Sequence, residues 1–126
     1  MTRPDSITEV AHRASDVTVF WYQVMDFIDE FRKLRDPRML SDEPALLAAH
    51  FEAGQIADAY LAAVAVTLAR EIGVAPAGWA QSASRQLLRP WFAHPGPALR
   101  ATLLAESPAA FRERNLFVSA NALSRA

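Results

Sequence analysis

The chain has 126 residues, of which 52% are hydrophobic and 21% charged, and its formal net charge is -1. This composition is typical of one globular domain, and the nearly balanced charge makes direct nucleic-acid binding unexpected. The chain has no cysteine, which excludes disulfides, thiolate catalysis and Cys-bound zinc. We interpret residues 1–126 as a single domain.

Targeting and membrane segments are not expected from this sequence. No apolar signal region follows Met1-Thr2-Arg3-Pro4. The longest apolar run, residues 59–69, is about half the roughly 20 residues that a membrane span needs. These observations predict a cytoplasmic protein that does not contact a membrane.

Apolar residues in the first third of the chain recur at alternating spacings of three and four, which is a heptad pattern. They are Ile7, Val10, Ala14, Val17, Trp21, Val24, Ile28 and Phe31. Asp5 or Ser6 can cap the start of a helix, and Asp36-Pro37 ends it. We therefore predict one uninterrupted helix over residues 7–35, within an N-terminal region of residues 1–36.

The predicted length of this helix raises the question of what its seam contacts. At about 1.5 Å per residue the helix would be about 43 Å long, whereas a compact domain of this size is about 36 Å across. The seam is either an ordinary core face or a surface that also binds a second chain. In the second case Trp21, Ile28 and Phe31 are candidate partner contacts.

A family-like body and tail are expected over residues 37–126, beginning with a second long helix. Ser41 or Asp42 can cap this helix, which is predicted to end near Ile72, with Gly73 as its C-cap. The two long helices would form an antiparallel hairpin.

Shorter elements are expected after Gly73, because five of the eight prolines lie between positions 76 and 108. We predict short helices over residues 81–88 and 98–105, the latter with its leucines (99, 103 and 104) facing inward. The segment RPWFAHPGP, residues 89–97, is predicted to be an irregular Pro-rich loop. Ser107 is expected to cap a last helix that begins at Pro108. The fold class is all-α.

Catalytic and metal-binding motifs are sparse. The three histidines (12, 50 and 94) are far apart in sequence, and no pair has the spacing of metal ligands. The four glycines stand singly, so no phosphate-binding loop is present. We expect no metal and no cofactor. Arg89 and His94 have the R-x4-H spacing of HEPN ribonucleases, and this resemblance implies an all-helical enzyme that acts on RNA across a dimer.

The C-terminal third is the basic part of the chain. Residues 85–126 contain six arginines and two glutamates, a balance of +4. Arginine is suited to bidentate contacts with carboxylates or phosphates. Within this third, Arg112 and Arg114 are candidate partner contacts.

The last twelve residues raise a separate energetic question. Their four sizeable apolar side chains would contribute about 8 kcal/mol on burial, whereas ordering twelve residues costs about 12 kcal/mol or more. Hydrogen bonds, either to the body or to a partner, must supply the difference. The segment 116–118 is expected to be extended. Phe111 and Phe117 are expected to anchor the tail, and Phe117 is also a candidate partner contact.

The chain from about Asp36 onward resembles the C-terminal domain of a group of actinobacterial helix-turn-helix proteins. The segments that carry the resemblance are EIGVAPAGWA at 71–80 and the tail, where Ser107, Pro108, Phe111, Arg112, Arg114, Phe117, Val118 and Leu123 match the pattern. Members are often encoded beside nucleotidyltransferase-like proteins in a toxin–antitoxin arrangement. Residues 1–35 depart from the helix-turn-helix that usually precedes this domain.

The sequence supports three functional hypotheses. The first, implied by the resemblance, is a non-enzymatic antitoxin-like protein that neutralises a nucleotidyltransferase-like toxin by direct binding. The second is an HEPN-like ribonuclease that uses Arg89 and His94. The third is a homodimeric helical scaffold.

Overall fold

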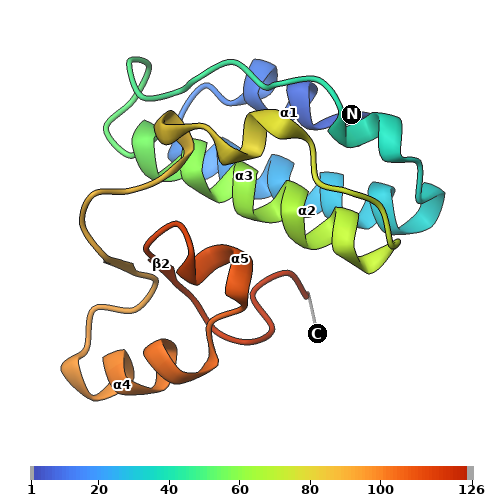
Figure 1. Ribbon diagram of the computed structural model, residues 1–126. Coiled ribbons are helices and arrows are strands. Elements are labelled where there is room, and N and C mark those ends of the chain that lie inside the picture. The colour runs from blue at the N-terminus through green and yellow to red at the C-terminus, as the bar shows by residue number, and fades with distance from the viewer. Residues whose placement is uncertain (1, 125–126) are drawn as a thin grey trace.

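The computed structural model describes residues 2–124, which form a mostly helical domain (Figure 1). The α-helices are α1 (Ile7–Arg13), α2 (Val17–Leu34), α3 (Gly54–Glu71), α4 (Pro97–Glu106) and α5 (Ala109–Arg112). Short 3-10 helices span Pro37–Leu40, Gly78–Gln81 and Ala83–Arg85, and two short strands are β1 (Trp91–Phe92) and β2 (Leu116–Phe117). The all-α class is therefore confirmed at the level of a mostly helical fold.

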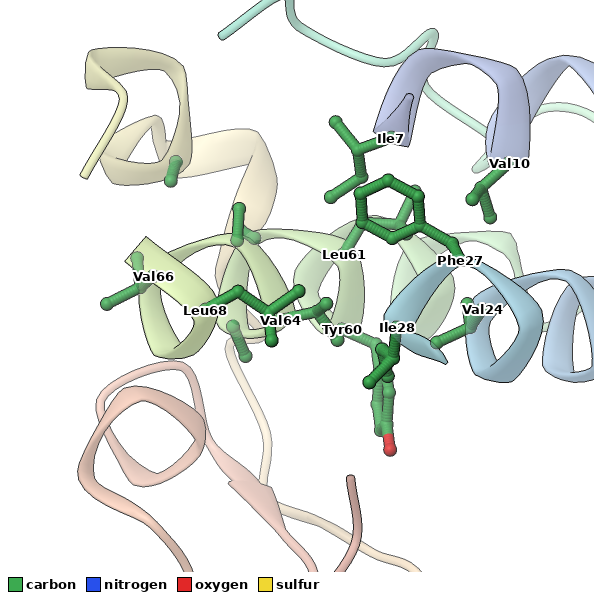
Figure 2. Packing of buried hydrophobic residues seen from close by; sticks show 14 of the residues in the cluster. Ile7, Val10, Val24, Phe27, Ile28, Tyr60, Leu61, Val64, Val66 and Leu68 are labelled. Carbon is green, nitrogen blue, oxygen red and sulfur yellow. The ribbon is translucent and has the colours of Figure 1, made fainter. Parts of the chain in front are cut away.

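The predicted single helix over residues 7–35 is wrong, because the chain breaks between Arg13 and Val17. Asp16 accepts a hydrogen bond from the Val19 N–H (2.9 Å) and caps the start of α2. After this break α1 packs against α2, and Figure 2 shows Ile7 of α1 beside Phe27 of α2. At about 1.5 Å per residue the 18 residues of α2 span about 27 Å, so no helix within residues 2–124 is longer than the expected width of the domain.

The antiparallel hairpin is also corrected, since α2 and α3 run side by side in the same direction (Figure 1). Near their first turns Trp21 meets Tyr60 with ring centroids 4.8 Å apart. At their last turns Arg32 pairs with Glu71 at 2.8 Å. Contacts between like ends require a parallel pair, and the extended segment 41–53 carries the chain back to the start of α3.

Helix α3 occupies the centre of the domain and is buried on nearly every side. Small side chains, including Ala62, Ala63 and Ala65, allow close approach of α2, α5 and the 3-10 helices after residue 77. Figure 2 shows its apolar side chains, such as Leu61, meeting those of α1 and α2. A helix that is apolar all round is expected to be central rather than to lie at the surface.

The second long helix begins later than predicted, at Gly54 rather than near residue 43. Residues 41–53 instead form an extended segment and turns, which we call the strap. The strap crosses close to Gly54, where an added Cβ would collide with the Leu47 carbonyl group. Because the strap backbone passes this close to the first residue of α3, the helix does not extend back toward residue 43.

The C-terminal part, residues 86–124, forms a separate cluster of small elements against α3 (Figure 1). The irregular loop predicted over 89–97 contains β1, which pairs in parallel with β2 through Trp91 opposite Leu116 and Phe92 opposite Phe117. The predicted helix over 81–88 is replaced by the two short 3-10 helices, whereas the helix predicted over 98–105 is present as α4.

The tail docks on its own domain as far as the structure describes it. Leu116 and Val118 are buried, and the Trp91 and Ala93 N–H groups donate to the carbonyls of Asn115 and Phe117 at 2.8 and 3.0 Å. The side chain of Arg32 in α2 also donates to the Leu123 carbonyl. These hydrogen bonds supply the stabilisation that the apolar side chains of the tail cannot provide alone.

Ser107 joins α4 to the tail instead of capping the next helix. Its hydroxyl accepts from the Val118 N–H at 2.8 Å and lies 2.7 and 2.9 Å from the carbonyl oxygens of Leu103 and Val118. The α5 helix, which follows, begins at Ala109 without a side-chain cap. The prediction that Ser107 caps the last helix is therefore wrong, because its hydroxyl bonds to backbone groups of Leu103 and Val118 and not to the first turn of α5.

Replacing Ser107 with alanine should lower the free energy of unfolding by about 1–3 kcal/mol, since the buried Val118 N–H would lose its acceptor. Urea denaturation measures this change. Ser41→Ala is a suitable control, because the Ser41 hydroxyl is exposed and bonds only within its own turn. Equal stabilities of the two variants would contradict the role given to Ser107.

Candidate functional site

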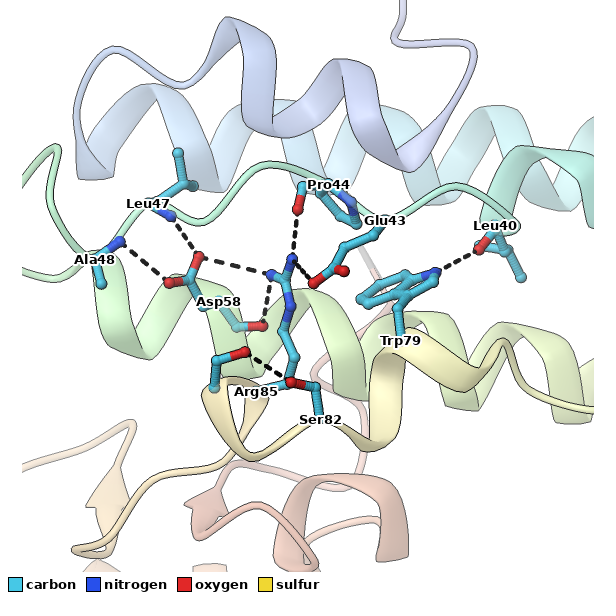
Figure 3. A network of polar contacts seen from close by, with 10 residues as sticks. Leu40, Glu43, Pro44, Leu47, Ala48, Asp58, Trp79, Ser82 and Arg85 are labelled. Carbon is cyan, nitrogen blue, oxygen red and sulfur yellow. Dashed lines mark hydrogen bonds and ion pairs between the residues drawn. The ribbon is translucent and has the colours of Figure 1, made fainter.

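A buried ion-pair network holds the strap and the 3-10 helices to α3 (Figure 3). Arg85 is 0% exposed, and its guanidinium lies 3.1 Å from a Glu43 oxygen and 3.7 Å from an Asp58 oxygen. It also donates to the Pro44 carbonyl and stacks on Trp79, 5.0 Å from the ring centroid. These contacts join three chain segments, so we interpret the network as structural.

Asp58 lies on α3 at the centre of this network. Its carboxylate accepts from the N–H groups of Leu47 and Ala48 at 2.6 and 3.1 Å. Burial raises the pKa of Asp58 above its ordinary value, and the hydrogen bond from Leu47 and the charge of Arg85 oppose that shift. The buried carboxylate therefore depends on its partners to remain charged.

Arg114 is a second buried arginine, and its placement corrects the prediction of a partner contact. Its side chain is 1% exposed and donates to the carbonyls of Ala110 and Ala80 at 2.8 and 2.9 Å. Burial lowers the pKa of Arg114, and the nearby Glu113 opposes that shift. Arg114 thus links α5 to the 3-10 helix at residues 78–81 and is not available at the surface.

Two candidates from the predicted N-terminal seam are also internal. Ile28 and Phe31 are 0% exposed and belong to the main core, so neither reaches a partner in this structure. Trp21 is half-buried and packs against both Tyr60 and Trp91. The break after Arg13 lets α1 fold back onto α2, so the face of α2 that carries Ile28 and Phe31 is covered from within the domain.

The candidates at the other end of the chain differ in exposure. Phe111 is 0% exposed and anchors α5 against Tyr60, as predicted. Phe117 is half-buried, with its ring stacked on Phe92 at a centroid distance of 5.1 Å. Arg112 is exposed. Among the tail candidates, Arg112 and part of Phe117 are therefore accessible to a partner.

Arg89 and His94 are both exposed and lie in the irregular segments on either side of β1, not on a helix. Trp91 stands between them. Arg89 lines a cavity of about 360 Å³ together with Gln55, Leu88 and Trp91, whereas His94 lines a different one of about 290 Å³. The structure thus places the two side chains in separate cavities of one chain.

Fewer arginines of the C-terminal third are exposed than the predicted basic surface would require. Arg85 and Arg114 are buried, and Arg125 lies outside the described residues. Arg89, Arg100 and Arg112 remain exposed, and Arg100 lies over the Phe92 ring at 5.1 Å. Within residues 85–124, the exposed positive charge therefore comes from three of the five arginines.

The exposure of several leucines in and before α4 is the feature that the sequence did not predict. Of the large apolar side chains left exposed in the described chain, three fall within residues 88–104: Leu88 (94% exposed), Leu99 (47%) and Leu104 (49%). Leu99 and Leu104 were predicted to face inward. Only Leu103 of α4 is buried, because α4 packs mainly against the small strand β2.

Comparisons with known proteins do not assign the chain to a family: no family model, curated protein or solved structure matches it. Within residues 2–124, no group of three histidine, aspartate or glutamate side chains is placed to share a metal ion. No helix in the same range has the length and apolar character needed to cross a membrane.

Proposed function

We propose that the chain is a non-enzymatic protein-interaction module that docks a partner on α4 and its flanking segment. The observation that carries this proposal is the state of α4, a ten-residue helix with one buried side chain and no side-chain N-cap. Helices this short are marginal in water unless an apolar face is packed. Leu99 and Leu104 flank the buried Leu103 and lie about 140° apart around the helix. A partner that contacts α4 on both sides of Leu103 would supply that packing.

The exposed charges in this part of the chain and the resemblance of the tail support a class of partner. Arg89, Arg100 and Arg112 are exposed in the same part of the chain, and arginines at an interface favour carboxylates on the other side. A nucleotidyltransferase-like toxin with an acidic surface, bound and neutralised in the manner of an antitoxin, is the partner we propose. The ribonuclease hypothesis has no comparable support, because Arg89 and His94 lie in separate cavities.

Co-expression with the product of the adjacent gene tests the proposal. We expect the two proteins to co-purify and the growth defect caused by the partner to be relieved. Leu99→Glu and Leu104→Glu should each weaken the complex about tenfold or more, since each introduces a charge into an apolar contact. Leu34→Glu is the matched control, because Leu34 is 54% exposed at the end of α2.

Two results would overturn the proposal. The first is co-expressed proteins that neither associate nor restore growth. The second is equal weakening by Leu34→Glu and Leu104→Glu, which would indicate a general effect of charge. The homodimer hypothesis gives a different outcome, namely a dimer by light scattering that Leu104→Glu dissociates with no partner present.

A further inference from the structure

A small pocket lies where α2 and α3 meet the C-terminal part of the chain. It has a volume of about 290 Å³, and its lining includes the rings of two tryptophans and a tyrosine, contributed by α2, α3 and residues 91–122. The lining residues are Trp21, Tyr60, Trp91, Ala93, His94, Val118, Ser119 and Ala122. We call it the aromatic pocket. Its volume is at the lower end of the range for small-molecule sites, which suits one ring system.

The hydroxyl of Tyr60 is the unusual group in this pocket. The residue is 6% exposed, yet its hydroxyl makes no hydrogen bond with any residue that the structure describes. Figure 2 shows the hydroxyl pointing away from the apolar cluster that surrounds α3. The hydroxyl is not among the fully buried atoms that lack a partner, which in the described chain are Arg85 Nε and Arg114 Nε, so it opens onto the pocket that it lines. A molecule bound there can accept its hydrogen bond in place of water.

Tyr60 is held in position by its aromatic neighbours. Its ring meets Trp21 edge-on at a centroid distance of 4.8 Å and Phe111 at 5.1 Å. Burial raises the pKa of Tyr60 to about 12, so the hydroxyl keeps its proton at neutral pH and remains a donor. The acceptor atom of a ligand can therefore be an oxygen of either a neutral or an anionic group.

The walls of the pocket favour a flat, unsaturated ligand. The rings of Trp21 and Trp91 are nearly parallel, with an interplanar angle of 16° and centroids 6.4 Å apart. Aromatic rings pack against such walls by stacking or edge contacts, which contribute beyond the area that they bury. No carboxylate lines the pocket, and its other polar side chains are those of His94 and Ser119. This lining provides no counter-charge for a cation.

We propose that the aromatic pocket binds a small planar aromatic molecule that carries an acceptor oxygen on its ring substituent, such as an aryl carboxylate or an aryl amide. The ring lies against Trp21 and Trp91, and the oxygen accepts a hydrogen bond from Tyr60. This site lies apart from the exposed leucines of α4, and the proposal does not depend on the interaction function.

Titration of the full chain with benzoate and with benzamide, followed by calorimetry and tryptophan fluorescence, tests the proposal. At least one of the two should bind saturably at one site per chain, and the comparison shows whether the ligand is anionic or neutral. Cyclohexanecarboxylate and cyclohexanecarboxamide have the same polar groups without the aromatic ring. Each should bind about tenfold more weakly than its aromatic counterpart.

Two tyrosine variants provide the matched test. Tyr60→Phe removes only the unpartnered hydroxyl, so it should weaken binding about tenfold while leaving the urea midpoint unchanged or higher. Tyr22→Phe makes the same chemical change on a residue that is 69% exposed and should leave binding unchanged. Trp91→Leu, which removes one wall, should weaken binding and reduce the fluorescence response.

Three outcomes would overturn the proposal. They are the absence of saturable binding by both aromatic probes, equal binding of the aromatic and cyclohexane compounds, and equal affinity of the wild type and Tyr60→Phe. A chain that binds its protein partner but neither aromatic probe would overturn the pocket proposal alone. A chain that binds a probe but no partner would leave the pocket proposal standing and overturn only the interaction function.

Discussion

Replacement of Arg85 by methionine should lower the free energy of unfolding by about 3–5 kcal/mol, because it leaves a buried carboxylate without its counter-charge. Methionine fills much of the space of the arginine stem, so the loss would be mainly electrostatic. Asp58 is 1% exposed and would retain only the N–H groups of Leu47 and Ala48 as partners. Urea denaturation at neutral pH measures the change.

The pH dependence of this variant gives a second measurement. Loss of Arg85 removes a charge that opposes the raised pKa of Asp58, so the pKa should rise further in the folded variant. A carboxyl group whose pKa is raised on folding contributes stability below its unfolded pKa and loses that contribution as the pH rises through its folded pKa. The difference between the wild type and Arg85→Met should therefore shrink as the pH falls toward 4.

Arg38→Met is the control, because Arg38 belongs to an exposed ion pair with Asp36. The Asp36 carboxylate holds the pKa of Arg38 above its ordinary value through their side-chain hydrogen bond, yet exposed pairs of this kind contribute little to stability. The control should unfold close to the wild-type midpoint. If Arg85→Met and Arg38→Met lose equal stability, the buried network is not what holds the strap to α3.

Substitution of Gly54 by alanine should destabilise the domain by about 3 kcal/mol, at the upper end of the usual cost of overpacking. An added Cβ would lie well inside van der Waals contact of the Leu47 carbonyl group and 2.8 Å from the Ala48 Cα. Both neighbours are backbone, so they cannot rotate away. The strap must shift, and the hydrogen bonds from Leu47 and Ala48 to Asp58 would lengthen with it.

Gly78→Ala provides the comparison, since an added Cβ at Gly78 meets nothing within 4 Å. Gly78, like Gly54, is the first residue of a helical segment, so the two substitutions differ mainly in the space available. Thermal and urea unfolding should show a large loss for Gly54→Ala and little change for Gly78→Ala. Similar midpoints for the two variants would mean that the strap moves freely at this point.

The positions of helical segments could be predicted from local pattern, but their boundaries and directions were less accessible. The heptad spacing placed Val24, Ile28 and Phe31 on one apolar face but left open whether that face meets the core or a partner, and the structure buries all three in the core. It did not reveal the break after Arg13, because the apolar period continues across Ala14, where α1 ends, and Asp16 then caps the start of α2. The cap depends on a single hydrogen bond, whereas the apolar period extends over many residues, so the prediction followed the period and missed the break.

The candidate site was predicted in part. Exposure of Arg112 and burial of Phe111 followed from the sequence pattern of the tail. Arg114 was predicted to meet a partner, and no role was predicted for Arg85. Arginine is usually exposed, and a sequence does not show which carbonyls or carboxylates will surround a buried one. Tyr60 and Trp91 are 31 positions apart, and no local signal connects them.

The sequence by itself determined a single, cysteine-free, mostly helical domain, with a long helix that ends near Ile72 and an extended segment near residue 116. These features depend on composition, periodicity and local turn chemistry. Only the tertiary structure decided that α2 and α3 run in parallel, that two arginines are internal, and that α4 leaves its leucines exposed. Each of these depends on which distant segments meet, because burial and charge pairing are set by contacts between elements and not by the order of residues within one.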